Sequence, residues 1–350
     1  MIPPAKLSVL VVGGAGYIGS HMVKLLLAEG HDVTVLDNLS RGHRDAVQSA
    51  RFVEADLLDP RALAAAFAGM RFDAVMHFAA FCYVGESVQK PREYYRNNVV
   101  GTLNLLDAMA DARVGKLVFS STCATYGDPV EMPMRESHPQ RPVNPYGATK
   151  LAVETILRDY ARAYGLTSVA LRYFNAAGSD PEGRIGERHD PETHLIPLVL
   201  MEALRVRGGG DPARTGLVVN GDDYDTPDGT CIRDYVHVDD LAQAHLAAVR
   251  RMMDRTITGA SACNLGTENG FSVLEVIDSC RKVTGVPVRY KVGPRRPGDP
   301  PRLVAESSAA RAVLGWEPRY RDLDSIVATA WRWFSTHHRI SSDRKVSRGG

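Results

Sequence analysis

The sequence predicts an α/β fold, a doubly wound parallel sheet with helices on both faces, together with a smaller C-terminal α/β domain. Short apolar runs alternate with amphipathic runs through the first half, as expected for buried parallel strands and the helices between them. Glycines and polar residues follow the carboxyl ends of these strands, which is where doubly wound sheets bind ligands. After Asn175 the alternation gives way to sequence rich in glycine, proline and charge.

The composition is that of an ordinary globular protein. The 350 residues are 44% hydrophobic and 24% charged, with a net charge of +1, which favours neither nucleic acid nor an anionic membrane as a partner. No uncharged apolar run approaches about 18 residues, and a strand begins close to the N-terminus. We therefore expect a soluble, cytoplasmic protein. The cysteines are scattered and show no metal-ligand spacing, so we expect neither a disulfide framework nor a metal site: Cys82, Cys123, Cys231, Cys263 and Cys280.

The first strand is predicted at residues 7–12 (LSVLVV), and it leads directly into a glycine-rich turn. Gly13, Gly16 and Gly19 satisfy G-x-x-G-x-x-G, and the amphipathic helix that follows ends near Gly30. Small residues between a strand and a helix let the backbone approach a pyrophosphate, which the positive helix N-terminus then binds. The turn therefore predicts a dinucleotide site.

An acidic residue at the end of the second strand selects the dinucleotide. The strand at residues 33–36 ends in Asp37, about 20 residues beyond the glycines, where a carboxylate accepts hydrogen bonds from the adenosine ribose and repels a 2′-phosphate. We expect NAD and not NADP.

The alternation then continues through four further strands. Asp56 follows the third strand, the small residues Ala79 and Ala80 follow the fourth, and Thr122 follows the fifth, all at one sheet edge. The strands are predicted at residues 51–55, 73–77, 116–119 and 167–173, with helices at 91–112 and 145–163 among the segments between them.

The stretch Asn144-Pro145-Tyr146-Gly147-Ala148-Thr149-Lys150 opens one of these helices, because Asn is a good N-cap and Pro fits the first helical position. Tyr146 and Lys150 are four residues apart and share one helix face. A phenol ionises near pH ~10, so its use as a base at neutral pH requires stabilisation of the phenolate. The Lys150 cation and the helix N-terminus can both provide it. Tyr-x-x-x-Lys is also common as a solvent-exposed pair on a helix. Because this pair lies at the same sheet edge as the glycine turn, a catalytic role is favoured.

The second half is expected to form a smaller ligand-binding unit. Ser272 and Glu275 form a capping box at the start of one of its helices. We expect a dinucleotide-binding domain at 5–177, joined by a returning segment at about 232–260, a second domain at 178–231 and 261–338, and a tail at 339–350.

Several motifs together resemble the extended short-chain dehydrogenase/reductase family, and within it the sugar-nucleotide 4-epimerases. The resemblance covers about residues 7–337 and implies a Rossmann dinucleotide-binding domain. The motifs that carry it are GGAGYIGSH, HFAA, VGESVQKP, YYRNNVVGT, FSSTCATYGD, NPYGATK and LRYFNAAG.

The resemblance implies reversible C4 epimerisation of a UDP-hexose through a transient 4-keto sugar with tightly bound NAD. It implies Tyr146 as the base, Thr122 as its hydroxyl partner and Lys150 as a residue that binds the nicotinamide ribose and lowers the phenol pKa. The cofactor-binding residues that it implies are Gly13, Gly16, Tyr17, Ile18, Gly19, Asp37, Asn38, Asp56, Leu57, Phe78, Ala79, Ala80, Asn97, Tyr146, Lys150 and Tyr173.

The expected substrate contacts come mainly from the second half. The guanidinium groups of Arg233 and Arg296 can each bind a diphosphate, and the Asp299 carboxylate can accept hydrogen bonds from a ribose diol. With Thr122, the resemblance adds Asn175, His194, Leu195 and Leu303. Three positions depart from other members: Cys82 replaces a lysine, His194 replaces an asparagine, and Leu303 replaces a tyrosine that excludes N-acetylated sugars.

Other activities remain open at this point. A 4,6-dehydratase would need an Asp-Glu pair after Thr122, where Cys123 and Ala124 stand. A UDP-xylose/UDP-arabinose or UDP-N-acetylglucosamine 4-epimerase would use the same chemistry. A non-catalytic NAD-binding sensor would not need Tyr146, Lys150 and Thr122 together. By resemblance we expect a homodimer that pairs the helices near 91–112 and 145–163.

Overall fold

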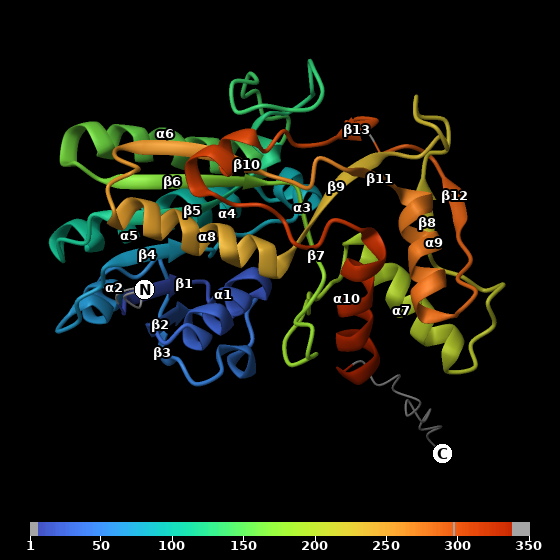
Figure 1. Ribbon diagram of the computed structural model, residues 1–350, viewed down its shortest axis with the longest axis horizontal. Helices are drawn as coiled ribbons and strands as arrows, with labels where there is room; N and C mark the ends of the chain where they lie inside the picture. Colours follow the sequence, from blue (N-terminus) through green and yellow to red (C-terminus); the bar gives the residue numbers. More distant parts are fainter. Residues whose placement is uncertain (1–5, 297, 338–350) are drawn as a thin grey trace.

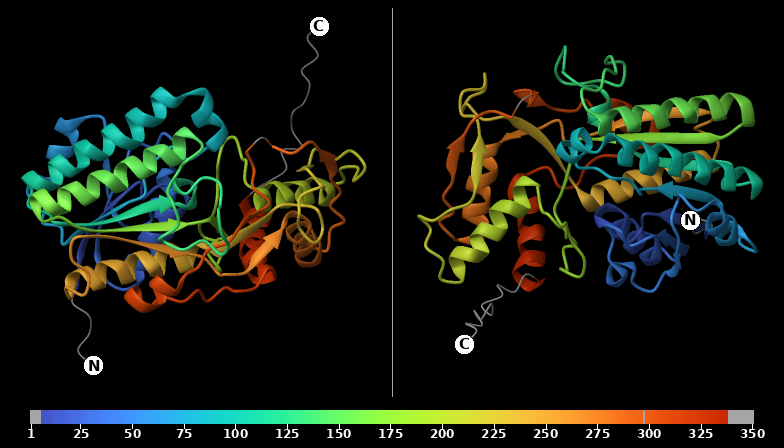
Figure 2. Two further views of the ribbon diagram at one scale, coloured as in Figure 1. Left: turned by 90° about the horizontal axis from the view of Figure 1, so that it is seen from above. Right: turned by 180° about the vertical axis from the view of Figure 1, so that it is seen from behind.

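The computed structural model describes residues 6–296 and 298–337 (Figure 1). The expected tail at 339–350 lies outside these residues. Within them the chain forms a large parallel sheet covered by helices, with a smaller unit beside it that contains α7, α9 and α10 (Figure 2). None of the helices in the described part of the chain combines the length and apolar character that a membrane span needs.

The large sheet confirms the predicted doubly wound fold. Its seven strands are all parallel and lie in the order β10-β6-β5-β4-β1-β2-β3. The order reverses at β1, so the loops after β1 and β4 diverge and leave a crevice at the carboxyl edge. The strands are β1 (Ser8–Val12), β2 (Asp32–Asp37), β3 (Arg51–Glu54), β4 (Ala74–His77), β5 (Lys116–Thr122), β6 (Thr167–Tyr173) and β10 (Ala260–Leu265).

Helices cover both faces of this sheet because side chains alternate along each strand. Val9 and Val11 pack towards α1 (Tyr17–Ala28) and α8 (Val238–Met253). The intervening Leu10 and Val12 pack on the opposite face, against α2 (Pro60–Phe67), α5 (Gly101–Asp111) and α6 (Pro145–Tyr164). Shorter helical segments are η1 (Arg44–Val47), α3 (Val84–Gln89), η3 (Cys123–Thr125) and η4 (Ala310–Leu314).

The helix predicted at 91–112 is divided into three parts, α4 (Pro91–Tyr94), the π-helical segment η2 (Tyr95–Val100) and α5. A π-helical turn places one extra residue in the helix and re-aims the side chains around it. Here the segment includes Asn98, which is only 3% exposed and faces the loop after β4.

The smaller unit combines a four-stranded sheet and a two-stranded sheet with three helices. β9 (Ile232–His237) is central and pairs with β7 (Asn175–Ala177), β11 (Gly270–Ser272) and β13 (Arg302–Leu303). The other members are β8 (Val218–Asn220), β12 (Lys291–Gly293), α7 (Leu195–Arg207), α9 (Val273–Thr284) and α10 (Leu323–His337). The predicted capping box of Ser272 and Glu275 is confirmed at the start of α9.

The chain returns to the large sheet at positions that differ from those expected. β9, expected in the returning segment, lies in the small sheet, and the return begins with α8. β10, which extends beyond the expected limit at 260, pairs with β6 and forms an edge of the large sheet. The sequence of β10 (ASACNL) begins with small and polar residues, so its register with β6 decides its place.

Candidate active site

The glycine turn packs directly against the loop after β4. Gly13 has φ +79°, and a Cβ atom there would lie 2.4 Å from the amide nitrogen of Ala79. A Cβ on Gly19 would lie 2.1 Å from the carbonyl oxygen of Gly13. These contacts explain why glycine is required at both positions.

The N-terminus of α1 fits a dinucleotide pyrophosphate. Its N-cap is Gly16, which provides no side-chain hydrogen bond to the first turn, so backbone N–H groups remain available to an anion. A Cβ on Gly16 would meet only the Gly13 oxygen, at 3.4 Å, within 4 Å. Tyr17, the first helical residue, donates a hydrogen bond to the carbonyl of Gly178, 2.5 Å away.

Asp37 lies beside this turn, as predicted. Its carboxylate is buried and accepts hydrogen bonds from the backbone N–H of Ala15 (3.0 Å) and of Leu39 (2.8 Å). Burial raises the pKa of Asp37, although the two N–H donors oppose this effect. Each carboxylate oxygen retains a second lone pair for a ribose hydroxyl. Neighbouring Asn38 donates to Asp56 (2.9 Å), which joins the ends of β2 and β3.

The loop after β4 is held by Asn98, which the sequence analysis did not select. Asn98 accepts from the N–H of Phe81 (2.8 Å) and donates to its carbonyl (3.0 Å). The expected cofactor residue Asn97 instead donates to the Asn98 side chain, 2.9 Å away. The backbone N–H groups of Phe78 and Ala79 donate hydrogen bonds to the carbonyl of Val12. Both asparagines lie in the π-helical segment η2.

A cation, the guanidinium of Arg41, lies near Cys82. The guanidinium of Arg41 lies 5.5 Å from the ring of Phe81 and 5.1 Å from the ring of Tyr83. It also pairs with Glu86 at 3.1 Å. Positive charge is therefore present on this side of the crevice, supplied by a different element.

The predicted catalytic residues lie together at the carboxyl edge. The side chain of Asn144 accepts from the N–H of Gly147 (2.9 Å), so α6 begins as predicted, with Pro145 in its first turn. Thr122 ends β5, and its hydroxyl oxygen accepts a hydrogen bond from the N–H of Ala124 (3.2 Å). Lys150 is 3% exposed, and its Nζ donates to the carbonyl of Ser120, 2.8 Å away.

Burial has the largest effect on the Tyr146 phenol and raises its pKa, whereas the Thr122 hydroxyl acts in the opposite direction. Burial also lowers the pKa of Lys150 to about 8, because a buried ammonium loses its hydration. The Lys150 Nζ donates to the Ser120 carbonyl, and further positive charge near Tyr146 would favour the phenolate.

A buried polar network behind these residues was also missed. Glu154, one turn after Lys150 on α6, accepts from Ser121 (2.6 Å) and from Arg172 (3.0 and 2.6 Å). Arg172 in turn donates to Tyr126 (2.9 Å). The spacing of Glu154 from Lys150, i and i+4 on the same buried face, is the sequence signal that could have revealed it.

The predicted diphosphate binders lie across the crevice, in the smaller unit. Arg233 donates from Nη1 to the Ile232 carbonyl (2.8 Å), and its Nη2 contacts Asp299, another predicted substrate residue. Arg296 lies beside Asn220, whose side-chain oxygen, with its amide flipped, accepts from Nε (3.1 Å) and Nη2 (3.2 Å). Asn175 donates to the Asp234 carbonyl (3.0 Å), which links β7 to β9.

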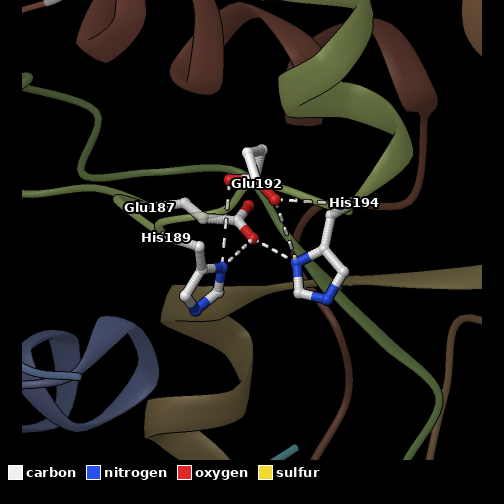
Figure 3. A group of neighbouring side chains, drawn as sticks. All are labelled: Glu187, His189, Glu192 and His194. Carbon is white, nitrogen blue, oxygen red and sulfur yellow. Dashed lines mark hydrogen bonds and ion pairs between the residues drawn. The ribbon is translucent and has the colours of Figure 1, made fainter. Parts of the chain in front are cut away.

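The remaining predicted substrate residues have different surroundings. Leu303 pairs with Arg233 in the register of β13 and, like Cys123, packs against the buried cluster of Tyr126, Met134, Phe174 and Ala305. Leu195 begins α7 and packs on the core of the smaller unit. The His194 ring contacts Glu187 and thus faces a cluster of acidic and histidine side chains (Figure 3).

Of the other expected cofactor residues, Tyr173 and Ile18 pack on the core between the sheet and α1. Leu57 is buried on the opposite face, where its carbonyl accepts from Asn104 (2.8 Å). His237 has a structural role, because its ring accepts a hydrogen bond from the N–H of Asp239 (3.1 Å) and caps α8.

Comparison with known proteins places these features in context. Residues 9–259 match the model of the NAD dependent epimerase/dehydratase family. A UDP-glucose 4-epimerase of Halalkalibacterium halodurans is 51% identical over 340 residues, 97% of this chain and 99% of that protein. The crystal structure of the Brucella ovis UDP-glucose 4-epimerase with NAD is 51% identical, with a TM-score of 0.87 over 93% of this chain and 97% of that one. The Bifidobacterium longum UDP-glucose 4-epimerase with NAD+ and UDP is 39% identical, with a TM-score of 0.86 over 94% and 98%.

Proposed function

Because the chain belongs to the NAD dependent epimerase/dehydratase family, we propose that it is an isomerase that interconverts UDP-glucose and UDP-galactose by inversion at C4, with NAD as a bound cofactor. The observation that carries the proposal is the placement of Tyr146 one helical turn before buried Lys150 on α6, at the sheet edge where β5 ends in Thr122. Relatives named UDP-glucose 4-epimerase that align along nearly the whole chain support it.

Residues of the large unit would bind the dinucleotide. The uncapped N-terminus of α1 at Gly16 would bind the pyrophosphate, and Asp37 would accept from the adenosine ribose. When bound, NAD supplies an oxidised nicotinamide that exchanges a hydride with the sugar and adds a positive charge to the site. Tyr146 is partly buried, and electrostatic interactions are stronger in such a site than in bulk water.

Tyr146 moves the proton in this proposal. Its phenolate oxygen takes the proton of the 4-hydroxyl as the 4-keto sugar forms, and returns it when the opposite epimer forms. The Thr122 hydroxyl lowers the pKa of the phenol and so favours its charged form. Lys150, fixed by the Ser120 carbonyl, provides an ammonium that can donate to a ribose hydroxyl without leaving its place.

The smaller unit would hold the UDP while the sugar turns. One N–H of the Arg233 guanidinium donates to the Ile232 carbonyl and another donates to Asp299. The remaining N–H donors can bind phosphate oxygens. Arg296 lies beside Asn220 at the end of β8. Anchoring through the diphosphate alone would leave the hexose free to present either face, as inversion at C4 requires.

The residue type at position 303 favours a second substrate class, UDP-N-acetylhexosamines. Leu303 is half-buried and packs, like Cys123 and Met132, against one buried cluster, and all three side chains lack the bulk of a tyrosine ring. An aliphatic wall at this position leaves space for an acetamido group.

We further propose a homodimer that acts in the cytoplasm. Val84, Val88, Tyr95 and Val100 are large apolar side chains that are at least 43% exposed on α3 and η2. Such a strip on the outer face, close to α6, favours pairing with a second copy. All five cysteines are free thiols, which is consistent with a reducing compartment.

The proposed function is tested with purified protein and no added NAD. The protein is incubated separately with UDP-glucose, UDP-xylose and UDP-N-acetylglucosamine, and the epimers are separated by chromatography. We expect UDP-glucose to be converted, and Tyr146→Phe to reduce the rate by roughly 10²–10⁴-fold while its NAD content is unchanged. Undiminished epimerisation by Tyr146→Phe, or turnover of UDP-xylose alone, would contradict the proposal.

A further inference from the structure

A cluster of four side chains in the loop between β7 and α7 has the composition of a metal site. Glu187, His189, Glu192 and His194 each contribute one atom to a group in which all four lie within 4.8 Å of one another (Figure 3). The carboxylates are well buried, with side chains 4% and 6% exposed, whereas the His194 side chain is 47% exposed. The group is therefore fixed at its base and open to solvent on one side.

The spacing of the four atoms matches a tetrahedral ligand shell. Ligand atoms about 2.0–2.2 Å from a Zn²⁺ ion lie about 3.3–3.6 Å apart. His189 Nδ1 lies 3.1 Å from an oxygen of Glu187 and 3.8 Å from an oxygen of Glu192. His194 Nδ1 lies 3.8 Å from the other Glu192 oxygen, and its contact with Glu187 is closer. Coordination of one ion would require His194 to move away from Glu187.

Some buried polar atoms of the cluster have no hydrogen-bond partner in the described part of the chain. His189 Nδ1 is buried and makes no hydrogen bond, although Glu187 is within reach, because the geometry is unfavourable. One oxygen of Glu192 accepts from the backbone N–H of Thr193 (2.7 Å) and of His194 (2.9 Å). The other Glu192 oxygen, at 3.8 Å from His189, has no such donor among the described residues. Buried polar atoms that face one another without bonding are expected where an ion completes the site.

The ion-pair partners of the two carboxylates are the two imidazoles. Among the ion pairs of residues 6–296 and 298–337, none joins Glu187 or Glu192 to a lysine or arginine. Arg188 pairs with Asp45, and Arg184 with Asp180. A divalent ion would balance the two carboxylates while both imidazoles remain neutral, which is the form that binds metals.

Contacts beyond the four ligands keep them in position, as in established metal sites. The His189 ring lies edge-on to the rings of Tyr17 and Tyr83, with centroids 6.2 and 5.8 Å away. The Nε1–H of Trp333 donates to the Glu187 carbonyl, 3.0 Å away.

We propose that Glu187, His189, Glu192 and His194 bind one divalent first-row transition metal ion, with Zn²⁺ as the tetrahedral case. Two imidazoles with two carboxylates select such ions over Ca²⁺ and Mg²⁺, which prefer oxygen ligands alone. The ion would fasten the loop beside Tyr17, the first residue after the glycine turn, and beside the start of α7. The effect on NAD rests on the proposed function: the metal-loaded protein should lose NAD more slowly than the metal-free protein.

The test uses the full chain without a polyhistidine tag, stripped of metal with a chelator that is then removed. Zn²⁺, Mn²⁺ and Ca²⁺ are added separately, and bound metal is measured by elemental analysis together with the thermal midpoint. We expect about one equivalent of Zn²⁺ and a higher midpoint with Zn²⁺, little effect of Ca²⁺, and loss of both Zn²⁺ responses in Glu187→Gln and His194→Gln.

The matched control is Glu182→Gln, which removes the same charge from the same loop at an exposed side chain that pairs with Arg184. It should bind Zn²⁺ like the wild type. Wild-type protein that binds no Zn²⁺, that prefers Ca²⁺, or that binds Zn²⁺ equally in Glu187→Gln and Glu182→Gln would overturn the metal site. None of these readings uses epimerase activity, so failure of the site and failure of the proposed function are distinguishable.

Discussion

Arg172 and Glu154 form a buried, bidentate ion pair behind the strand that carries Thr122. The guanidinium donates to the two carboxylate oxygens at 3.0 and 2.6 Å, and the two side chains are only 5% and 2% exposed. Ser121 and Gln140 bind the same carboxylate. The pair thus connects β5, β6 and α6, the three elements that position Thr122, Tyr146 and Lys150.

Glu154→Gln should destabilise the protein by about 3–5 kcal/mol, because it leaves the Arg172 charge buried without a partner. The measurement is the free energy of unfolding in urea. The double variant Glu154→Leu with Arg172→Met removes both charges and should recover most of the loss. A single variant as stable as the wild type would show that the pair does not contribute to stability.

The same ion pair should make the fold sensitive to acid. Burial raises the pKa of Glu154, but the hydrogen bond and charge of Arg172 outweigh it, and the net effect is a lowered pKa. A carboxyl whose folded pKa is depressed contributes stability above its unfolded pKa of about 4.3 and loses it as the pH falls further. The unfolding free energy of the wild type should therefore fall relative to that of the double variant below about pH 4. A difference that stays constant down to pH 3 would exclude this linkage.

Gly16→Ala should weaken NAD retention and preserve the fold. The added methyl group meets only the Gly13 oxygen, at 3.4 Å, but lies where the backbone must approach a pyrophosphate. We expect purified Gly16→Ala to contain at least about tenfold less NAD, equivalent to 1.4 kcal/mol of binding, with an unchanged circular dichroism spectrum. Gly115→Ala, where an added Cβ has no neighbour within 4 Å, is the control and should retain NAD. Equal NAD content in both variants would refute the role given to the uncapped helix end.

Leu303→Tyr should narrow the range of substrates. The larger ring would occupy space that an acetamido group needs. We expect kcat/KM for UDP-N-acetylglucosamine to fall by about 10–200-fold relative to that for UDP-glucose, a range typical of single pocket contacts. The measurement is the ratio of the two constants. Leu303→Met, which conserves volume, is the matched control, and a ratio that moves equally in both variants would argue against a steric effect.

Features that depend on neighbouring residues in the chain could be predicted from the sequence. The glycine turn before α1, the Asn144 cap of α6 and the Ser272–Glu275 capping box are all confirmed. Each depends on backbone conformation within one or two turns, which residue type and spacing determine directly. The parallel sheet was predictable for a similar reason, because strands buried on both faces are continuous apolar runs.

Features that depend on side chains distant in the chain required the tertiary structure. Arg233 and Asp299 were predicted separately as ligand contacts, and only folding brings them together, from positions 66 residues apart. Asn98 replaces Asn97 against the loop after β4 because a π-helical segment shifts the register of the helix.

The sequence by itself determined where phosphates and a reactive phenol can be placed, because helix ends, glycine turns and strand ends are local. The tertiary structure decided how those groups are charged and paired. Burial, which no residue has until the chain is packed, raises the pKa of Tyr146, lowers that of Lys150 and encloses the two carboxylates beside His189 and His194.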